Sequence, residues 1–270
     1  MQPAFSLVTF NCFGGLSWSP RRRLLTLARE LERAGPTAVC LQEVQTHGAR
    51  RLLIDACQSY TAHAYAPGLQ APRGALLTLS RAPLSQGTFL SYETQGAWHG
   101  PTLMDRLTRK GALVAQLYWG ELSVVIINTH LLANYGADWR RASRAAQDQQ
   151  RQLLDLAALV RQQPAARLVV LAGDFNLPRG SWLYEEFVAS SGMLDSLAAD
   201  MRPTYRPFPG VPASYALPID FVFVRMPEGT ALAVTADLCF GEPLALVGGG
   251  YDYLSDHLGV RLTISRIVDS

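Results

Sequence analysis

The stretch Val169–Pro178, which reads V-V-L-A-G-D-F-N-L-P, contains the clearest fold signal in the chain. Its first four residues are apolar without polar alternation, which indicates a strand buried on both faces. The strand ends at Gly173, and Asp174 and Asn176 follow two residues apart, so their side chains are expected to face one ligand. Asp174 would accept a proton or hold a water, and Asn176 would donate to an anionic oxygen. A turn capped by Asp and Asn is the alternative interpretation of an isolated G-D-x-N.

Further apolar runs predict strands, and runs with helical spacing predict helices between them. The expected strands are Phe5–Phe10, Ala38–Leu41, Tyr60–Tyr65, two within Ala75–Ser91, Ala112–Tyr118, Leu122–Asn128, Ile219–Val224, Leu232–Asp237 and Leu258–Ile264. The expected helices are Pro20–Ala34, Gly48–Cys57, Asp138–Gln162 and Ser181–Ser190, with irregular loops at Gln95–Arg109 and Arg202–Pro212. This order predicts an α/β fold of two packed mixed β-sheets flanked by helices, rather than a Rossmann fold or a barrel.

Length and composition indicate one domain over residues 1–270, because 49% of the residues are hydrophobic and no long linker interrupts the chain. No run of 18 apolar residues and no secretory signal occurs, so we expect neither a transmembrane segment nor export. Four cysteines without C-x-x-C spacing favour free thiols and a cytoplasmic location. The net charge of +2 is too small to indicate a nucleic-acid partner by itself, and Lys110 is the only lysine in the chain.

Several expected strands end in the same kinds of polar side chain. The residues at these ends are Asn11, Glu43, His130, Asp174 with Asn176, Asp220, and Asp256 with His257. A single strand-end Asn or Asp is usually a cap, and a single His is usually structural. Because α/β folds gather their active sites at strand ends, the repeated pattern predicts one shared site. The glycines at 248–250, just before this last pair, fit either a mobile lid or a tight turn.

These residue types fit the hydrolysis of a phosphate ester. Glu43, Asn11 and Asp256 supply hard oxygen ligands that suit Mg²⁺, with Mn²⁺ as a substitute, and no thiolate or multi-histidine cluster favours zinc. His130 and His257 supply a general base and a cationic partner for an anionic oxygen. No G-x-S-x-G motif or activated cysteine is present, so we expect direct attack by water.

Six motifs, in order over nearly the whole chain, resemble the endonuclease/exonuclease/phosphatase superfamily of DNase I-like enzymes. They are T-F-N-C-F-G, L-Q-E-V, I-N-T-H-L, G-D-F-N-L-P, P-I-D-F-V-F and L-S-D-H-L-G-V. The resemblance implies a DNase I-like four-layer α/β sandwich, which agrees with the two packed sheets expected above. It also implies Glu43 as the principal Mg²⁺ ligand, with Asn11 beside it and Asp256 supporting the metal site.

The resemblance implies roles for the other matched residues as well. His130 would donate to the scissile phosphate, while Asp174 and Asn176 position the water and the phosphate. Asp220 would orient His257, which is then the candidate general base. The family divides this task differently between the histidine and the Asp.

Within the family, three features are similar to neutral sphingomyelinases: N-C-F-G after the first strand, T-H-L-L-A-N-Y before the longest helix, and Lys110-Gly111. This similarity implies a phospholipid head group as the preferred substrate, contact with a membrane surface and no protein partner. Trp18 and Trp98 would then form a rim at the lipid interface, and Lys110 would contact phosphate. Two partly buried core aromatics and an ordinary exposed cation are the alternative interpretations. Leu132 departs from the T-H-x-H pattern of sphingomyelinases, which leaves the substrate open.

A nuclease of the same superfamily is the main alternative. Arg21–Arg23, Arg50-Arg51 and Arg140-Arg141 would track a phosphate backbone, and Tyr205 or Trp182 would stack on a base. Most of these arginines lie in expected helices, however, where a solvated face is favoured. An inositol phosphatase is disfavoured because P-I-D replaces P-x-W-x-D-R. An inactive binding module is disfavoured because every matched site position is intact.

Overall fold

Two six-stranded sheets form the centre of the computed structural model, which describes residues 3–13, 20–98, 102–207 and 210–267. The first sheet has the order β11-β14-β1-β2-β4-β3. Its strands are β1 (Phe5–Asn11), β2 (Ala38–Gln42), β3 (Ala62–Ala64), β4 (Leu77–Ser80), β11 (Leu232–Cys239) and β14 (Gly259–Arg266). It is mixed, because β1 runs parallel to β2 and antiparallel to β14.

The second sheet has the order β5-β6-β7-β8-β10-β9. Its strands are β5 (Thr88–Ser91), β6 (Gly111–Trp119), β7 (Leu122–His130), β8 (Leu168–Asp174), β9 (Leu194–Asp195) and β10 (Asp220–Arg225). It is mixed as well, because β8 runs parallel to β7 and antiparallel to β10. All of its strands come from the middle of the chain, whereas the first sheet joins the two ends of the chain.

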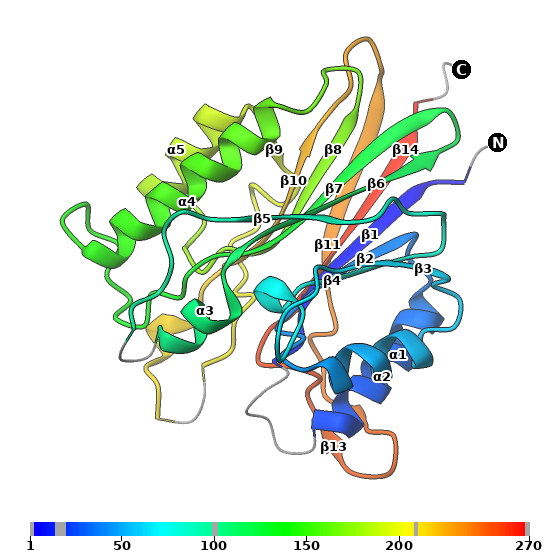
Figure 1. The fold of residues 1–270 in the computed structure, drawn as a ribbon, viewed down its shortest axis with the longest axis horizontal. Helices are drawn as coiled ribbons and strands as arrows, with labels where there is room; N and C mark the ends of the chain where they lie inside the picture. Colours follow the sequence, from blue (N-terminus) through cyan, green and yellow to red (C-terminus); the bar gives the residue numbers. More distant parts are fainter. Residues whose placement is uncertain (1–2, 14–19, 99–101, 208–209, 268–270) are drawn as a thin grey trace.

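The sheets pack face to face, and helices cover their outer faces (Figure 1). α1 (Pro20–Ala34) and α2 (His47–Ala56) pack on the first sheet, and α4 (Arg144–Arg161) and α5 (Trp182–Ser191) pack on the second. One apolar cluster lies between the sheets, and one lies under each pair of helices. These layers confirm the predicted four-layer α/β sandwich.

β8 shows why its sequence lacks polar alternation. Val169 and Leu171 pack toward α4 and α5, while Val170 and Ala172 pack between the sheets. Both faces of the strand are therefore buried, as the continuous apolar run predicts.

Two of the sequence expectations about helices are wrong. The segment Gln95–Arg109 was expected to be irregular, but α3 (Leu103–Thr108) forms within it. The long helix begins at Arg144 rather than Asp138, because Asp138 instead bonds Arg140 and receives the Asn134 amide at its carbonyl. Local side-chain bonds of this kind compete with helix formation.

The Gly248–Gly250 segment closes a short hairpin between β12 (Leu244–Ala245) and β13 (Tyr251–Asp252). All three glycines have positive φ, and the Leu246 amide donates to the Gly250 carbonyl oxygen at 2.9 Å. This geometry matches the tight-turn interpretation. Among the described residues, no helix is both long enough and apolar enough to cross a membrane.

Candidate active site

The predicted site residues come together at one end of the two sheets. Asn11 ends β1, and Glu43 follows β2, so the first sheet supplies these two. The second sheet supplies His130, Asp174 and Asp220, which lie side by side on three neighbouring strands because His130 pairs with Asp174 and Asp174 pairs with Asp220. The site therefore lies where the two sheets meet.

The carboxylate of Asp174 is the centre of this arrangement. Its Oδ2 lies 2.9 Å from Asn11 Nδ2, 3.5 Å from His130 Nε2 and 3.7 Å from His257 Nε2. Its Oδ1 accepts the Asn176 backbone N–H at 2.9 Å. The two histidine distances exceed those of direct hydrogen bonds, so a ligand oxygen between these groups would contact all three side chains.

Asn11 links the two sheets through its side-chain amide. Nδ2 donates to Asp174 Oδ2 and also to Glu43 Oε1 at 3.3 Å, while Oδ1 accepts from the Phe13 backbone N–H. The other Glu43 oxygen accepts from Gln45 at 3.1 Å. Asn11 Oδ1 keeps a second lone pair, so metal ligation remains open to it.

His257 is held by Asp220. Its Nδ1 lies 2.9 Å from Asp220 Oδ2, which places a proton on Nδ1 and turns Nε2 toward Asp174. The preceding residue, Asp256, is half-buried and accepts from Ser255 Oγ at 3.1 Å. The structure thus supplies the orienting contact that the sequence predicts for Asp220.

Gly173 makes the close pairing of β7 and β8 possible. A Cβ at this position would lie 1.9 Å from the Thr129 carbonyl oxygen, so no other residue fits without a backbone shift. Because Thr129 pairs with Gly173 directly beside the His130–Asp174 pair, this glycine sets the spacing of the two site residues.

Burial shifts the pKa values of three site carboxylates upward. Burial raises the pKa of Glu43, against the pull of Lys110 and His257. Burial raises the pKa of Asp174 to about 7, although the charge of His257 opposes it. Burial also raises the pKa of Asp256. The ionised forms of these three carboxylates are therefore poorly solvated.

The two histidines have opposite pKa shifts. Burial lowers the pKa of His130 well below its usual value, and the cations Lys110 and His257 lower it further. For His257, burial also disfavours the charged form, but the carboxylates of Asp220 and Asp174 outweigh it and raise the pKa well above its usual value. At neutral pH, His130 is neutral and His257 carries the positive charge.

The donor set fits a hard divalent cation. Glu43, Asp174 and Asp256 are buried or half-buried carboxylates whose pKa values are raised mainly by burial, and all offer oxygen ligands. Among the described residues, Asp174, Asp220 and His257 also have ligand atoms within 4.8 Å of one another. In this second group, the hydrogen bond to Asp220 already occupies Nδ1 of His257.

Lys110 is buried and forms an ion pair. It is 3% exposed, so the interpretation as an ordinary exposed cation is wrong, and its Nζ pairs with Asp105 Oδ1 at 3.1 Å. Its charge reaches Glu43 and His130, whose pKa values it lowers. Sequence analysis missed Asp105 because the α3 segment was expected to be an irregular loop.

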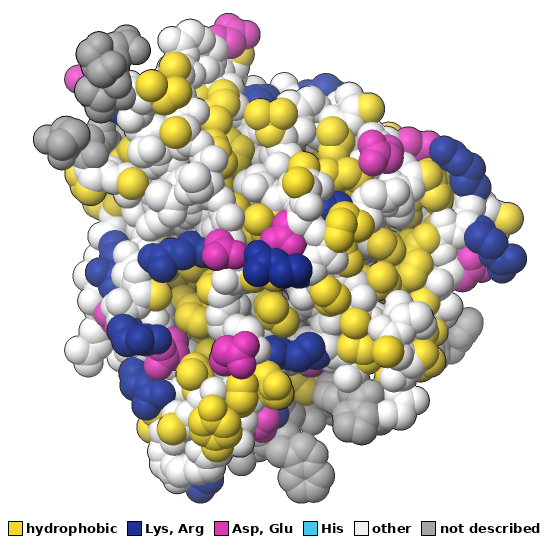
Figure 2. Space-filling view, turned by 180° about the vertical axis from the view of Figure 1, so that it is seen from behind, with side chains coloured by type: hydrophobic (Ala, Val, Ile, Leu, Met, Phe, Trp, Pro, Cys, Tyr) yellow, Lys and Arg dark blue, Asp and Glu magenta, His cyan; other side chains and the backbone are white. Residues whose placement is uncertain are grey.

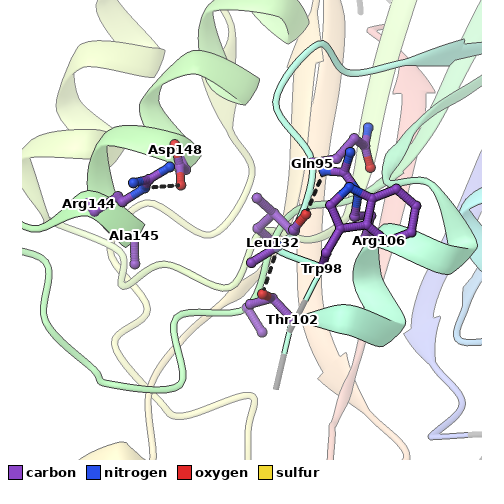
Figure 3. A pocket seen from close by; sticks show the side chains of 11 residues that line it. Gln95, Trp98, Thr102, Arg106, Leu132, Arg144, Ala145 and Asp148 are labelled. Atoms are coloured by element: carbon purple, nitrogen blue, oxygen red, sulfur yellow. Dashed lines mark hydrogen bonds and ion pairs between the residues drawn. The ribbon is translucent and has the colours of Figure 1, made fainter. Parts of the chain in front are cut away.

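Trp98 lies at the surface, and Trp18 falls outside the described residues. Trp98 is 69% exposed, so the interpretation as a partly buried core aromatic is wrong, and Arg106 stacks on its ring at 4.1 Å. Trp98 and Arg106 line a cavity of about 450 Å³, and Arg144 lies across from them on α4 (Figure 3). Leu132, two residues after His130, forms another part of its wall.

A buried amide pair behind the site was also missed. Gln42 Nε2 donates to Asn128 Oδ1 at 2.8 Å, and Asn128 Nδ2 donates to the carbonyl oxygens of Leu41 and Leu77. These bonds join the first sheet to the second directly beneath the catalytic end. Both residues lie inside the motifs L-Q-E-V and I-N-T-H-L, so the motifs themselves held the signal.

Several solved structures have this fold. The chain is 22% identical to sphingomyelinase C from Streptomyces griseocarneus (TM-score 0.69), with 97% of this chain and 99% of that chain covered. It is 16% identical to a magnesium-bound mutant of beta toxin from Staphylococcus aureus (TM-score 0.77; 96% and 99% covered). It is 19% identical to D. rerio TDP2 complexed with a single strand DNA product (TM-score 0.73; 97% and 99% covered). No curated protein matches the chain.

The sequence model of one family matches residues 8–257. This range contains all of the polar strand ends described above, from Asn11 to His257. The chain therefore belongs to the endonuclease/exonuclease/phosphatase family.

Proposed function

We propose that the protein is a Mg²⁺-dependent phosphodiesterase that attacks its substrate directly with water. The observation that carries this proposal is the convergence of Asn11, His130 and His257 on one oxygen of Asp174. This arrangement offers a proton acceptor and two imidazoles within reach of one ligand oxygen.

Asp174, rather than the already protonated His257, accepts the proton of the attacking water, and the charged imidazole of His257 faces it. Their facing atoms are 3.7 Å apart, and the raised pKa of Asp174, about 7, lies near neutral pH, where a general base is most effective. Asp220 keeps the imidazole in one orientation and compensates its charge. Asn176 fixes the Asp174 carboxylate through its backbone N–H.

His130 and Asn176 bind the phosphate. His130 is neutral, so it donates a hydrogen bond to a phosphate oxygen without repelling the charge of His257. The Asn176 amide is anchored at the Leu131 carbonyl oxygen at 3.1 Å and keeps one N–H free for the ligand. Lys110 adds positive charge from behind the site.

Glu43 would hold the cation, with Asn11 and Asp256 beside it. The bound ion would supply charge neutralisation on the phosphate and on the leaving oxygen. The magnesium-bound beta toxin of similar fold supports the choice of metal.

We favour a phospholipid head group as the substrate. Trp98 is exposed at the mouth of the cavity, and its indole ring suits the boundary between water and lipid. The cavity between Trp98 and α4 would receive the part of the lipid next to the phosphate. The sphingomyelinase C of similar fold supports this choice.

A nuclease is the second candidate, and the TDP2 structure with a DNA product supports it. The residues that would serve it are largely engaged elsewhere. Arg23 pairs with Asp252, Arg140 pairs with Asp138, and Arg141 pairs with Glu186 while covering Trp182. On the face seen in Figure 2, basic side chains lie among acidic ones instead of forming a continuous track.

One assay tests both candidates. Sphingomyelin, a lysophospholipid, supercoiled plasmid and an abasic duplex are offered side by side with Mg²⁺, and each is repeated with a chelator. We expect lipid hydrolysis that the chelator abolishes and that Trp98→Ala weakens through a higher KM. Plasmid cleavage without lipid turnover would transfer the proposal to the nuclease, and activity that survives chelation would reject the metal.

A further inference from the structure

The loop segment Thr204–Arg206 contacts the segments that carry Asp220 and His257. Asp220 belongs to the second sheet and His257 precedes a strand of the first sheet, so their 2.9 Å bond crosses from one sheet to the other. Neither strand ladder sets this distance. Between them, three consecutive loop residues contact the segments that carry the two partners.

Thr204 holds the strand that carries Asp220. It is fully buried, and its Oγ1 accepts the backbone N–H groups of Ile219 and Asp220, both at 3.0 Å. Its carbonyl oxygen accepts from the Leu258 backbone N–H at 2.7 Å. A single residue therefore fixes the backbone of Asp220 and the backbone next to His257.

Arg206 holds the segment that carries His257. Its backbone N–H donates to the Asp256 carbonyl oxygen at 2.7 Å. Its Nη2 donates to the carbonyl oxygens of Ser255 at 3.1 Å and His257 at 3.2 Å. Its Nη1 donates to Gly241 at 2.6 Å. The planar guanidinium thus ties the backbone on both sides of Asp256, which an ammonium group cannot reproduce.

Tyr205 completes the segment. It forms an isolated antiparallel bridge with His257, and its ring centre lies 5.2 Å from that of the imidazole at an interplanar angle of 51°. The ring thus limits the movement of His257 on one side. None of the three residues belongs to a strand of either six-stranded sheet.

We propose that Thr204–Arg206 is a positioning element that sets the Asp220–His257 bond by joining the two sheets at the site. The proposal rests on the role given to His257 in the proposed function. Loss of either anchor would let the imidazole move away from Asp174 without removing any group that touches substrate.

Paired substitutions test this element. Thr204→Val keeps the shape and removes the acceptor, whereas Thr204→Ser keeps the acceptor. Arg206→Lys keeps the positive charge and removes the planar guanidinium that donates through both Nη1 and Nη2. We expect Thr204→Val and Arg206→Lys to lower kcat about 10- to 100-fold with KM within about 2-fold, the usual scale for groups that orient a reacting side chain. Thr204→Ser should retain kcat within a few-fold.

Arg202→Gln is the matched control, because this arginine lies on the same loop but pairs with Asp200 and Asp237. It should leave kcat unchanged. Thermal unfolding shows which variants fold. If Thr204→Val does not fold, Arg206→Lys alone tests the proposal.

Proton NMR separates this proposal from the proposed function. We expect a low-field signal from the His257 Nδ1 proton, assigned by its loss in His257→Gln, that disappears in folded Thr204→Val and Arg206→Lys. If these variants keep both the signal and wild-type kcat, the positioning role is wrong. If the wild-type protein hydrolyses no phosphodiester, the proposed function fails, and the NMR signal still decides the positioning role.

Discussion

At the scale of single residues, the two histidines carry the largest share of the proposed chemistry. We expect His130→Gln and His257→Gln each to reduce kcat at least about 100-fold, because the first removes a donor to the phosphate and the second removes the cation that faces the general base Asp174. His63→Gln is the matched control, since His63 is exposed on β3 and stacks on Tyr65. Steady-state kinetics with Mg²⁺ measures the effect, and near-wild-type turnover in His257→Gln would remove that residue from the mechanism.

The carboxylate pKa values predict how metal and pH interact. A group whose pKa is raised in the folded state stabilises the fold below its unfolded pKa and loses that contribution as pH rises through the folded pKa. Asp174 and His257 both have this sign. The contribution of Asp174 is lost as pH rises from 3.8 to about 7, and that of His257 is lost as pH rises above 6.5, so the free energy of unfolding of the metal-free protein should fall across neutral pH. The expected slope is about 1.4 kcal/mol per pH unit for each proton. The lowered pKa of His130 has the opposite effect: it makes the free energy of unfolding rise with pH, but only below pH 6.5.

Mg²⁺ should reverse this trend, because it binds the ionised carboxylates and competes with protons. The increase in Tm on adding Mg²⁺ should therefore grow between pH 6.5 and pH 8. Differential scanning calorimetry at several pH values measures it, with Glu43→Gln as the control that should show little Mg²⁺ effect. A Mg²⁺ effect on Tm that is constant with pH would contradict the site described here.

The sequence predicted the identities of the central residues because each lies in a short motif at a strand end. It did not predict the contacts that a short helix and a loop make around them. Asp105 lies on α3 and pairs with Lys110, and Thr204 lies on a loop and accepts a bond from Leu258. No local pattern marks such contacts, so they appear only once the sheets are assembled.

At the scale of elements, the β7–β8 pairing depends on Gly173. Gly173→Ala should lower the free energy of unfolding by more than about 2 kcal/mol, because the added Cβ meets the Thr129 carbonyl oxygen at 1.9 Å. Activity should fall further than stability alone explains, since the His130–Asp174 spacing changes. Urea unfolding and kcat are the measurements.

Gly48 offers the contrasting position. It lies in α2, and a Cβ there would only meet Thr46 Oγ1 at 3.7 Å. Gly48→Ala should therefore stabilise the protein by about 0.5–1 kcal/mol and leave kcat unchanged. If Gly173→Ala and Gly48→Ala changed the free energy of unfolding equally, the close contact at Gly173 would not be the cause of the destabilisation.

Strands were easier to predict than helix limits in this chain. β8 and β10 have long apolar runs whose burial on both faces leaves one interpretation. α3 has only six residues, too few for a periodic pattern, and the start of α4 is decided by bonds among Asn134, Asp138 and Arg140. Such local competition is invisible to hydrophobic periodicity.

At the scale of the whole molecule, the two-sheet architecture was predictable because strands and helices alternate in both halves of the sequence. The pairing order was not, since β1 lies between β2 and β14, which is about 250 residues away in the chain. The substrate likewise depends on surfaces between loops, which is why the lipid preference rests on Trp98 and its cavity and not on a motif.

The division of the chain between the sheets has a consequence for its connectivity. The second sheet uses residues 88–225, and the first uses residues 5–80 and 232–266, with Phe5 paired to Ile264. The two termini therefore lie close together, at the end of the molecule away from α3 (Figure 1). A circular permutant that joins them by a short glycine linker and opens the chain within residues 81–87 would make each sheet from one continuous segment. Measurement of its kcat should give the wild-type value, because neither the new junction nor the new ends approach Asp174. The ribosome would then synthesise the whole second sheet before any strand of the first.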